Sequence, residues 1–304
     1  MLGIVVIAVG CDKTAGEKPA TSGPALDLNA NPDLLFHVFG ERAEPKMMPI
    51  AAIQGNSVVD INLPPEGWRA LDAKYLNPGA SYPIYRDGRA EGTVTILRGM
   101  WTAEPMYSLP GCAVLVPMAS VALSDTTHGF TVDQFATTRA PAVRPRTRVV
   151  PVDTVRAIAK RIGYEVGRGV DLDSLELETL DFRAIAIETG TNPRPTIVLS
   201  FIDPRGGDVA TGRGNTATVF VVADDDGTGY KASFRHAVNG DAANAEYRSF
   251  LDHLDLTGDG IDELLLEGWH FGAEAALRVL AWRNGTWREV FVGRSSWCVD
   301  APKR

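Results

Sequence analysis

Short apolar runs separated by turn residues dominate the first half of the chain. Five of these runs have the length and the β-branched content of strands, and they lie at 34–39, 49–53, 57–62, 92–98 and 112–118. Arg86-Asp87-Gly88 has the composition of a hairpin turn. Because no 3.6-residue period accompanies these runs, we expect a small β-barrel or β-sandwich over residues 31–133.

The second half begins with a helical pattern and then returns to strands. Val155, Ile158 and Ile162 fall on one face of a helix that is expected to end at Gly163. A second short helix is expected within the acidic run 171–181, whose carboxylates are most simply interpreted as solvated surface.

Two segments of the second half align with one another without a gap. IETGTNPRPTIVLS at 187–200 lies against LDLTGDGIDELLLE at 254–267, and each leads from a polar turn into an apolar strand. Each segment is followed by two more strands joined by a tight turn, of the Asp-Gly type at 226–227 and the Asn-Gly type at 284–285. Such a blade-like unit is typical of stacked β structure. Since closed propellers use about 4–8 blades, two units are expected to be completed by other strands.

The predicted fold class is therefore mainly β, a β-rich α+β protein. A C-terminal domain at 151–304, with one or two helices and two blade-like repeats, follows the N-terminal β domain at 31–133. The segment between them, 134–150, holds four arginines and no acid, which predicts an extended linker.

The second repeat contains an acidic loop, DLTGDGIDE, with oxygen atoms at alternate positions. The predicted ligands of a structural Ca²⁺ ion are the side chains of Asp255, Thr257, Asp259 and Glu263 and the carbonyl of Ile261. Calcium takes about six to eight oxygen ligands, and alternate positions of a tight loop can converge on one centre. An EF-hand is excluded because its twelfth position would be Leu266 and its flanks would be helices. The alternative is a solvated acidic turn that holds no ion.

This spacing resembles the calcium loop of FG-GAP and VCBS repeats, the modules of integrin-type β-propellers. In that family Asp-x-Asn/Asp-x-Asp-Gly-x-x-Asp precedes an apolar strand. Asp255, Asp259 and Gly260 match this pattern by position, and Glu263 matches it by charge. Thr257 departs from it with a weaker neutral ligand, so the resemblance implies a site of modest affinity. The first repeat keeps one acid within 187–200 and is expected to have lost the metal.

The N-terminal segment indicates export. MLGIVVIAVGC is apolar up to its glycine and cysteine, and a polar tether follows over 12–30. Residues 8–11, Ala-Val-Gly-Cys, resemble the lipobox of bacterial lipoprotein signals, although the apolar run is short and has no basic residue before it. The resemblance implies that 1–11 is a signal ending at a lipidated Cys11, and that the protein is lipid-anchored in the bacterial cell envelope, on the periplasmic or outer face. The alternative is a buried strand, but no phosphate-binding glycine motif follows it.

If Cys11 carries lipid, two cysteines remain, Cys112 and Cys298, and an exported protein would hold them in an oxidising compartment. They are predicted to form one disulfide, and the alternative is two buried free thiols. A net charge of −8 and the lack of a nucleic-acid-binding motif argue against a nucleic-acid partner.

Catalytic groups are few. His253 and His270 flank the acidic loop and its strand, and with Asp252 they offer a metal site, or with Ser249 a nucleophile pair. No HExxH, GxSxG, SxxK or CxxC motif frames these residues. We therefore expect a non-catalytic binding or scaffold lipoprotein with a protein or glycan partner. The alternative is an extracytoplasmic hydrolase that uses His253, His270 and nearby acids.

Overall fold

The computed structural model describes residues 26–99, 117–125, 129–139, 151–204, 214–270 and 275–293. Cys11, Cys112 and Cys298 lie outside these ranges, and so do most of the predicted tether and linker. Within the described ranges the protein is mainly β, as predicted from the pattern of short apolar runs.

The N-terminal half forms a seven-stranded antiparallel sheet with the strand order β1-β7-β4-β5-β6-β2-β3. Its strands are β1 (Asp33–Glu41), β2 (Lys46–Gln54), β3 (Ser57–Val59), β4 (Ser81–Arg86), β5 (Arg89–Arg98), β6 (Ala119–Asp125) and β7 (Thr131–Thr137). Because β1 also pairs with β2, the sheet closes into a barrel. The predicted hairpin turn joins β4 to β5 through Asp87 and Gly88, which have φ angles of 49° and 67°.

The strand predicted at 112–118 lies outside the described residues except for 117–118, and β6 begins just after it, at Ala119. The apolar pattern does not predict β4 or β7. Pro83 interrupts the first of these strands, and the second, TVDQFAT, carries a charge and an amide among its apolar residues. The last residues of β7 lie inside the range predicted as a linker, 134–150, and Phe135 is buried in the structure. The barrel therefore extends beyond residue 133.

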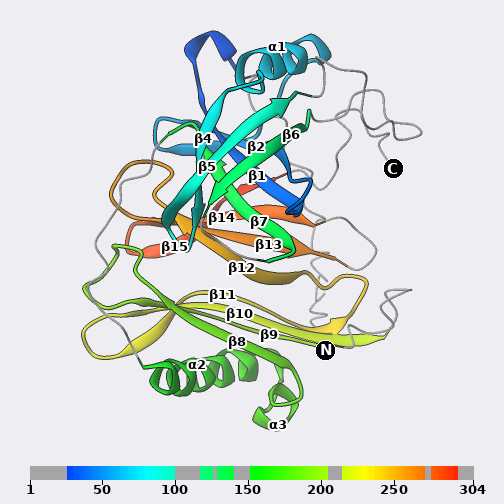
Figure 1. Ribbon diagram of the computed structural model, residues 1–304. Coiled ribbons are helices and arrows are strands. Elements are labelled where there is room, and N and C mark those ends of the chain that lie inside the picture. The colour runs from blue at the N-terminus through cyan, green and yellow to red at the C-terminus, as the bar shows by residue number, and fades with distance from the viewer. Residues whose placement is uncertain are drawn as a thin grey trace, which may run out of the picture.

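A helix, α1 (Pro65–Tyr75), covers one end of the barrel, where the sequence pattern indicates no helix (Figure 1). The helix buries Trp68, Leu71 and Tyr75, whose spacing of three and four residues places them on one face, in the barrel core. With only three large apolar side chains in 11 residues, this helical pattern does not stand out from the neighbouring strands. Trp68 is 1% exposed and belongs to the barrel core.

The end of the predicted tether also packs on the barrel. Leu26 belongs to the barrel core, and Leu28, in the short 3-10 helix η1 (Leu28–Ala30), packs against it. The described part of the range 12–30 is thus attached to the N-terminal domain.

The C-terminal half contains two four-stranded antiparallel sheets. The first sheet consists of β8 (Asp181–Ile187), β9 (Thr196–Ile202), β10 (Asn215–Asp225) and β11 (Tyr230–Asp241). The second sheet consists of β12 (Tyr247–Leu254), β13 (Glu263–Trp269), β14 (Ala276–Arg283) and β15 (Thr286–Val292). Strands pair in sequence order in both sheets, so each predicted unit of loop, strand and hairpin gains one leading strand, β8 or β12.

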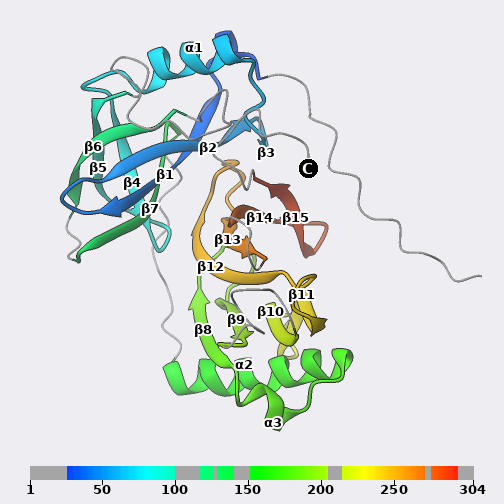
Figure 2. The same cartoon turned by 90° about the vertical axis from the view of Figure 1, so that its right-hand side faces the viewer.

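These sheets are stacked between two covers, as Figures 1 and 2 show. The inner faces of the two sheets meet in an apolar layer that includes Phe220 and Leu264. The outer face of the first sheet packs on α2 (Val152–Gly167) and α3 (Ser174–Leu177). The outer face of the second sheet packs on the barrel, in a shared core that includes Leu35 and Leu265. The two sheets are therefore covered without a closed propeller, because helices cover one outer face and the barrel covers the other.

The sequence predicts that helix α2 ends at Gly163, but the helix continues to Gly167. Gly163 is buried on the face of α2 that meets β9, and a Cβ at this position would overlap the ring of Phe201. The glycine thus permits close packing of the helix on the sheet. The predicted short helix in 171–181 is present as α3, which follows the 3-10 helix η2 (Arg168–Val170) and begins with a capping box of Asp173 and Glu176.

Candidate functional site at the domain junction

The acidic loop connects β12 to β13 and lies where the second sheet meets the barrel. Asp255 and Glu263 are each 1% exposed, and Leu256 belongs to the core shared with the barrel. The two ends of the loop are therefore buried in the junction, while its apex at Gly258–Gly260 is exposed.

The conformation of the loop is fixed by Asp255. Its Oδ1 accepts a hydrogen bond from the Gly258 N–H at 2.7 Å, and its Oδ2 accepts one from the Gly260 N–H at 3.1 Å. Both glycines have positive φ angles, 75° and 89°, which residues with a side chain adopt at a cost. Asp255 thus satisfies backbone donors that this sharp turn exposes.

Glu263 is bonded back onto the start of the loop. Its Oε2 accepts from the N–H groups of Leu256 and Thr257 at 2.9 and 3.2 Å, and its Oε1 accepts from Thr257 Oγ1 at 3.0 Å. Burial raises the pKa of the Glu263 carboxyl to about 7, against the opposing effect of these hydrogen bonds.

Arg283, the last residue of β14, brings a positive charge to the loop. Its Nη1 donates to Asp259 Oδ2 at 3.2 Å, and its Nη2 lies 3.9 Å from Glu263 Oε1. The same Nη2 donates to the carbonyl of Asn56, in the β2–β3 turn of the barrel, at 3.2 Å. One guanidinium therefore contacts two loop carboxylates and the other domain.

Arg139, two residues after β7, reaches the loop from the barrel side. Its Nη1 donates to the carbonyls of Leu256 and Thr257 at 3.2 and 3.1 Å, and its Nε donates to Asp33 Oδ2 at 2.9 Å. Arg139 is one of the four arginines of the predicted linker, and its guanidinium belongs to the junction.

The predicted calcium ligands do not point to one centre. Asp255 and Glu263 accept hydrogen bonds from the loop itself, and Asp259 accepts from the Ile261 N–H and from Arg283. Within the described ranges, no group of three or more His, Cys, Asp or Glu side chains is placed to hold a metal ion. In this arrangement the guanidinium of Arg283 is the positive charge beside Asp259 and Glu263. Calcium binding by Asp255, Thr257, Asp259, Ile261 and Glu263 stays a prediction of the sequence.

His253 is buried in the same junction, with a residue exposure of 4%. Its Nδ1 lies 2.7 Å from Asp262 Oδ2, and its ring packs against Gly88 in the β4–β5 turn of the barrel. The neighbouring Asp252 accepts a hydrogen bond from the Gly88 N–H at 3.1 Å, and burial raises the pKa of Asp252 to about 6. Asp252, His253 and Asp262 are thus all buried, and the first two contact the barrel.

His270 lies at the other end of the β12–β13 pair. The strand register places His253 opposite Leu264 and Tyr247 opposite Trp269, so about six residues, or roughly 20 Å of strand, separate the two histidines. His270 Nδ1 bonds to the carbonyl of Ala245 at 2.9 Å. The structure does not bring together the residues of the predicted alternative site.

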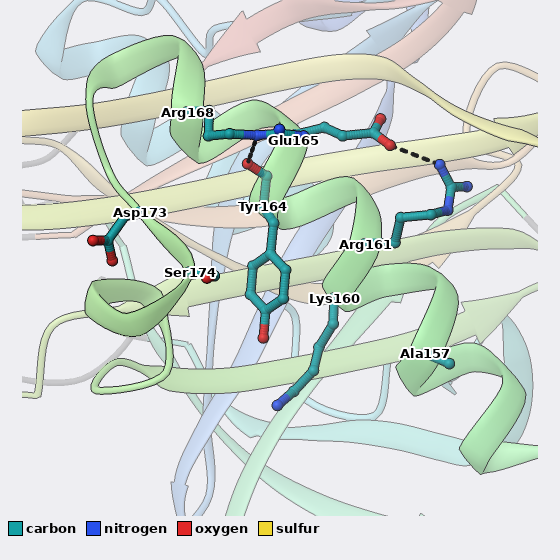
Figure 3. Close-up of a pocket in the computed structure, with 8 residues that line it drawn as sticks. All are labelled: Ala157, Lys160, Arg161, Tyr164, Glu165, Arg168, Asp173 and Ser174. Atoms are coloured by element: carbon teal, nitrogen blue, oxygen red, sulfur yellow. Dashed lines mark hydrogen bonds and ion pairs between the residues drawn. The ribbon is translucent and has the colours of Figure 1, made fainter.

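A groove with a volume of about 580 Å³ lies between α2 and α3 (Figure 3). Lys160 and Arg161 line it, and each pairs with a carboxylate: Lys160 Nζ lies 2.6 Å from Glu178 Oε1, and Arg161 Nη1 lies 2.9 Å from Glu165 Oε1. These pairs leave little unbalanced charge for a ligand, so the groove does not by itself indicate a binding site.

Sequence reasoning finds the acids of the junction but not its two arginines. Arg283 directly precedes the predicted Asn-Gly turn, and Arg139 sits in a segment whose composition is that of a linker. Neither position carries a local signal for a contact with a loop that lies 24 residues away in one case and 118 in the other.

None of the helices within the described ranges has the length and apolar character needed to cross a membrane. No protein-family model matches the chain, and neither a curated protein nor a solved structure matches it. The fold and the junction thus define a mainly β protein in which a barrel and a helix enclose two four-stranded sheets.

Proposed function

We propose that the protein is a non-catalytic binding or scaffold protein, anchored by lipid in the bacterial cell envelope. The observation that supports this proposal is the position of His253. Its side chain is 6% exposed, its Nδ1 lies 2.7 Å from Asp262 Oδ2, and its ring packs against Gly88 of the barrel. The groups best suited to acid–base chemistry therefore join the two domains.

The stacking supports a scaffold role. Each apolar sheet face has a partner, so the barrel and the α2–α3 layer are held at opposite ends of one stack. Such an arrangement would present a partner, protein or glycan, with surfaces at a fixed separation.

The absence of hydrolysis is tested with His253→Gln, which removes the imidazole and keeps a polar side chain of similar length. We expect purified wild type and variant to show the same background rates on p-nitrophenyl esters, phosphates and glycosides. A rate that wild type has and a folded His253→Gln variant lacks would support the hydrolase alternative and overturn the proposal.

The anchor rests on the lipobox-like residues 8–11. Cys11→Ser removes the thiol that would carry lipid, while Cys112→Ser makes the same chemical change elsewhere. We expect Cys11→Ser protein in the soluble fraction of the cells, and wild type and Cys112→Ser protein in the detergent-extractable membrane fraction. Retention of Cys11→Ser protein in the membrane fraction would exclude lipid anchoring at this cysteine.

A further inference from the structure

We propose that Arg283 supplies the positive charge that balances the acidic loop, so that the loop is a metal-independent clasp between the two domains. The clasp consists of Asp259, Glu263, Arg139, Arg283 and the β2–β3 turn at 55–56. This inference concerns the folding of the chain and does not depend on the proposed function.

The position of the guanidinium is the first support. Asp259 and Glu263 are the two predicted carboxylate ligands that accept no bond from Gly258 or Gly260. Arg283 faces both, with Nη1 3.2 Å from Asp259 Oδ2 and Nη2 3.9 Å from Glu263 Oε1. A divalent ion shared by these carboxylates would lie beside the guanidinium, and like charges at such short range repel. The arginine therefore occupies the place where a cation would act.

The first sheet gives independent support, because it contains the same ion pair with the charges exchanged. There, Arg194 in the β8–β9 loop pairs with Asp225, the last residue of β10. In the second sheet, Asp259 in the β12–β13 loop pairs with Arg283, the last residue of β14. In both repeats a loop is attached to the strand that precedes the hairpin turn, and the attachment uses one acid and one arginine.

The two arginines of the clasp also converge on one turn of the barrel. Arg283 Nη2 donates to the Asn56 carbonyl at 3.2 Å, and Arg139 Nη1 contacts the Gly55 carbonyl at 3.5 Å. Arg139 additionally binds the carbonyls of Leu256 and Thr257. Each domain thus donates one guanidinium to the other, which a loop closed on its own metal ion would not require.

The test is a set of thermal unfolding curves, recorded by circular dichroism in 1 mM EDTA and again in about 10 mM CaCl₂, which is at least about ten times the Kd of about 10⁻⁴–10⁻³ M that extracellular calcium modules have. The proteins are wild type, Arg283→Gln, Asp259→Asn, the double variant and a control, Arg183→Gln. Arg183 lies on β8 and is exposed, so its substitution removes an arginine without touching the junction.

We expect the wild-type Tm to be equal in EDTA and in calcium. Arg283→Gln and Asp259→Asn should each lower the Tm by the same amount in both buffers, while Arg183→Gln leaves it unchanged. The double variant should lose less than the sum of the single variants, because the pair interacts.

Two results would overturn the clasp. One is a wild-type Tm that rises in calcium and falls in EDTA. The other is a destabilisation by Asp259→Asn that appears only in calcium, because the residue would then act as a metal ligand. If Arg283→Gln protein does not fold, Asp259→Asn alone still separates the two outcomes.

Discussion

The indole Nε1 of Trp287, on β15, donates a hydrogen bond of 2.8 Å to Oδ2 of Asp224, on β10, and so joins the hairpins of the two sheets. Asp224 is 7% exposed and also accepts from Thr196 Oγ1 at 2.6 Å and from Ser233 Oγ at 2.5 Å. A buried carboxylate is tolerated where its oxygens are fully used, as they are here. The apolar layer between the sheets is thus supplemented by one fixed polar contact.

Substitution of Trp287 by Phe keeps an aromatic ring in this layer and removes the donor to Asp224. We expect the free energy of unfolding to fall by about 1–3 kcal/mol, because a buried charged group loses a partner. The measurement is urea unfolding followed by circular dichroism. Trp282→Phe is the control, since Trp282 packs edge-on against Trp287 and lies in the same layer. An equal loss in both variants would show that indole packing, and not the hydrogen bond, is responsible.

Gly163→Ala should destabilise the protein although alanine is the better helix former. A Cβ at Gly163 would overlap Phe201 on β9, so α2 would have to move away from the first sheet. Overpacking of this kind costs about 1–3 kcal/mol. Gly169→Ala is the matched change, because a Cβ at Gly169 meets nothing within 4 Å. Chemical denaturation of both variants tests the prediction, and an unchanged midpoint for Gly163→Ala would contradict it.

The raised pKa of Asp252 predicts how the stability of the protein depends on pH, including the sign of the effect. Burial raises its pKa from 3.8 to about 6 in the folded protein, so the folded state retains this proton to a higher pH than the unfolded chain does. The contribution of this residue to stability is therefore present in acid and is lost as the pH rises from about 4 to 6.

Asn at position 252 keeps an oxygen for the Gly88 N–H and has no charge to bury. Relative to wild type, Asp252→Asn should gain up to about 3 kcal/mol of stability between pH 4 and pH 7, which is the free energy that corresponds to a pKa raised from 3.8 to about 6. Urea midpoints at pH 4, 5, 6 and 7 measure the difference. A difference that does not change with pH would show that Asp252 titrates as it does in the unfolded chain.

Local signals are sufficient for the elements that follow a simple period. The Asp-Gly and Asn-Gly pairs predict the turns at 87–88 and 284–285, and the alignment of 187–200 with 254–267 predicts the repeated sheets. The face of α2 follows from Val155 and Ile162, which are 6% and 1% exposed. These features depend on residues close in sequence, so the local pattern of apolar and polar residues predicts them.

Features that depend on distant residues escape the same reasoning. Gly163 is a helix end by local preference, but its contact with Phe201 makes it an interior position. The charge of Asp259 suggests a metal ion, because nothing near it in the sequence shows that Arg283 lies beside it. The barrel's cover over the second sheet likewise arises from residues far apart, such as Leu35 and Leu265.

The junction between the domains is most directly probed by Gly88→Ala. Gly88 has a φ angle of 67°, and a Cβ there would lie 2.6 Å from His253 Cε1. Gly285 occupies the same place in the β14–β15 turn with a φ angle of 81°, but a Cβ there meets nothing within 4 Å. Both substitutions carry the left-handed backbone cost of about 1–2 kcal/mol.

Only Gly88→Ala adds a clash across the junction, which we expect to cost about 1–3 kcal/mol more. Urea unfolding of the two variants gives this difference, because the shared backbone cost cancels. Limited proteolysis supplies a second readout: Gly88→Ala should be cleaved between the barrel and the sheets more quickly than Gly285→Ala. Equal stability and equal cleavage of the two variants would show that Gly88 does not pack against His253 in solution. The barrel contact beside the clasp would then be absent.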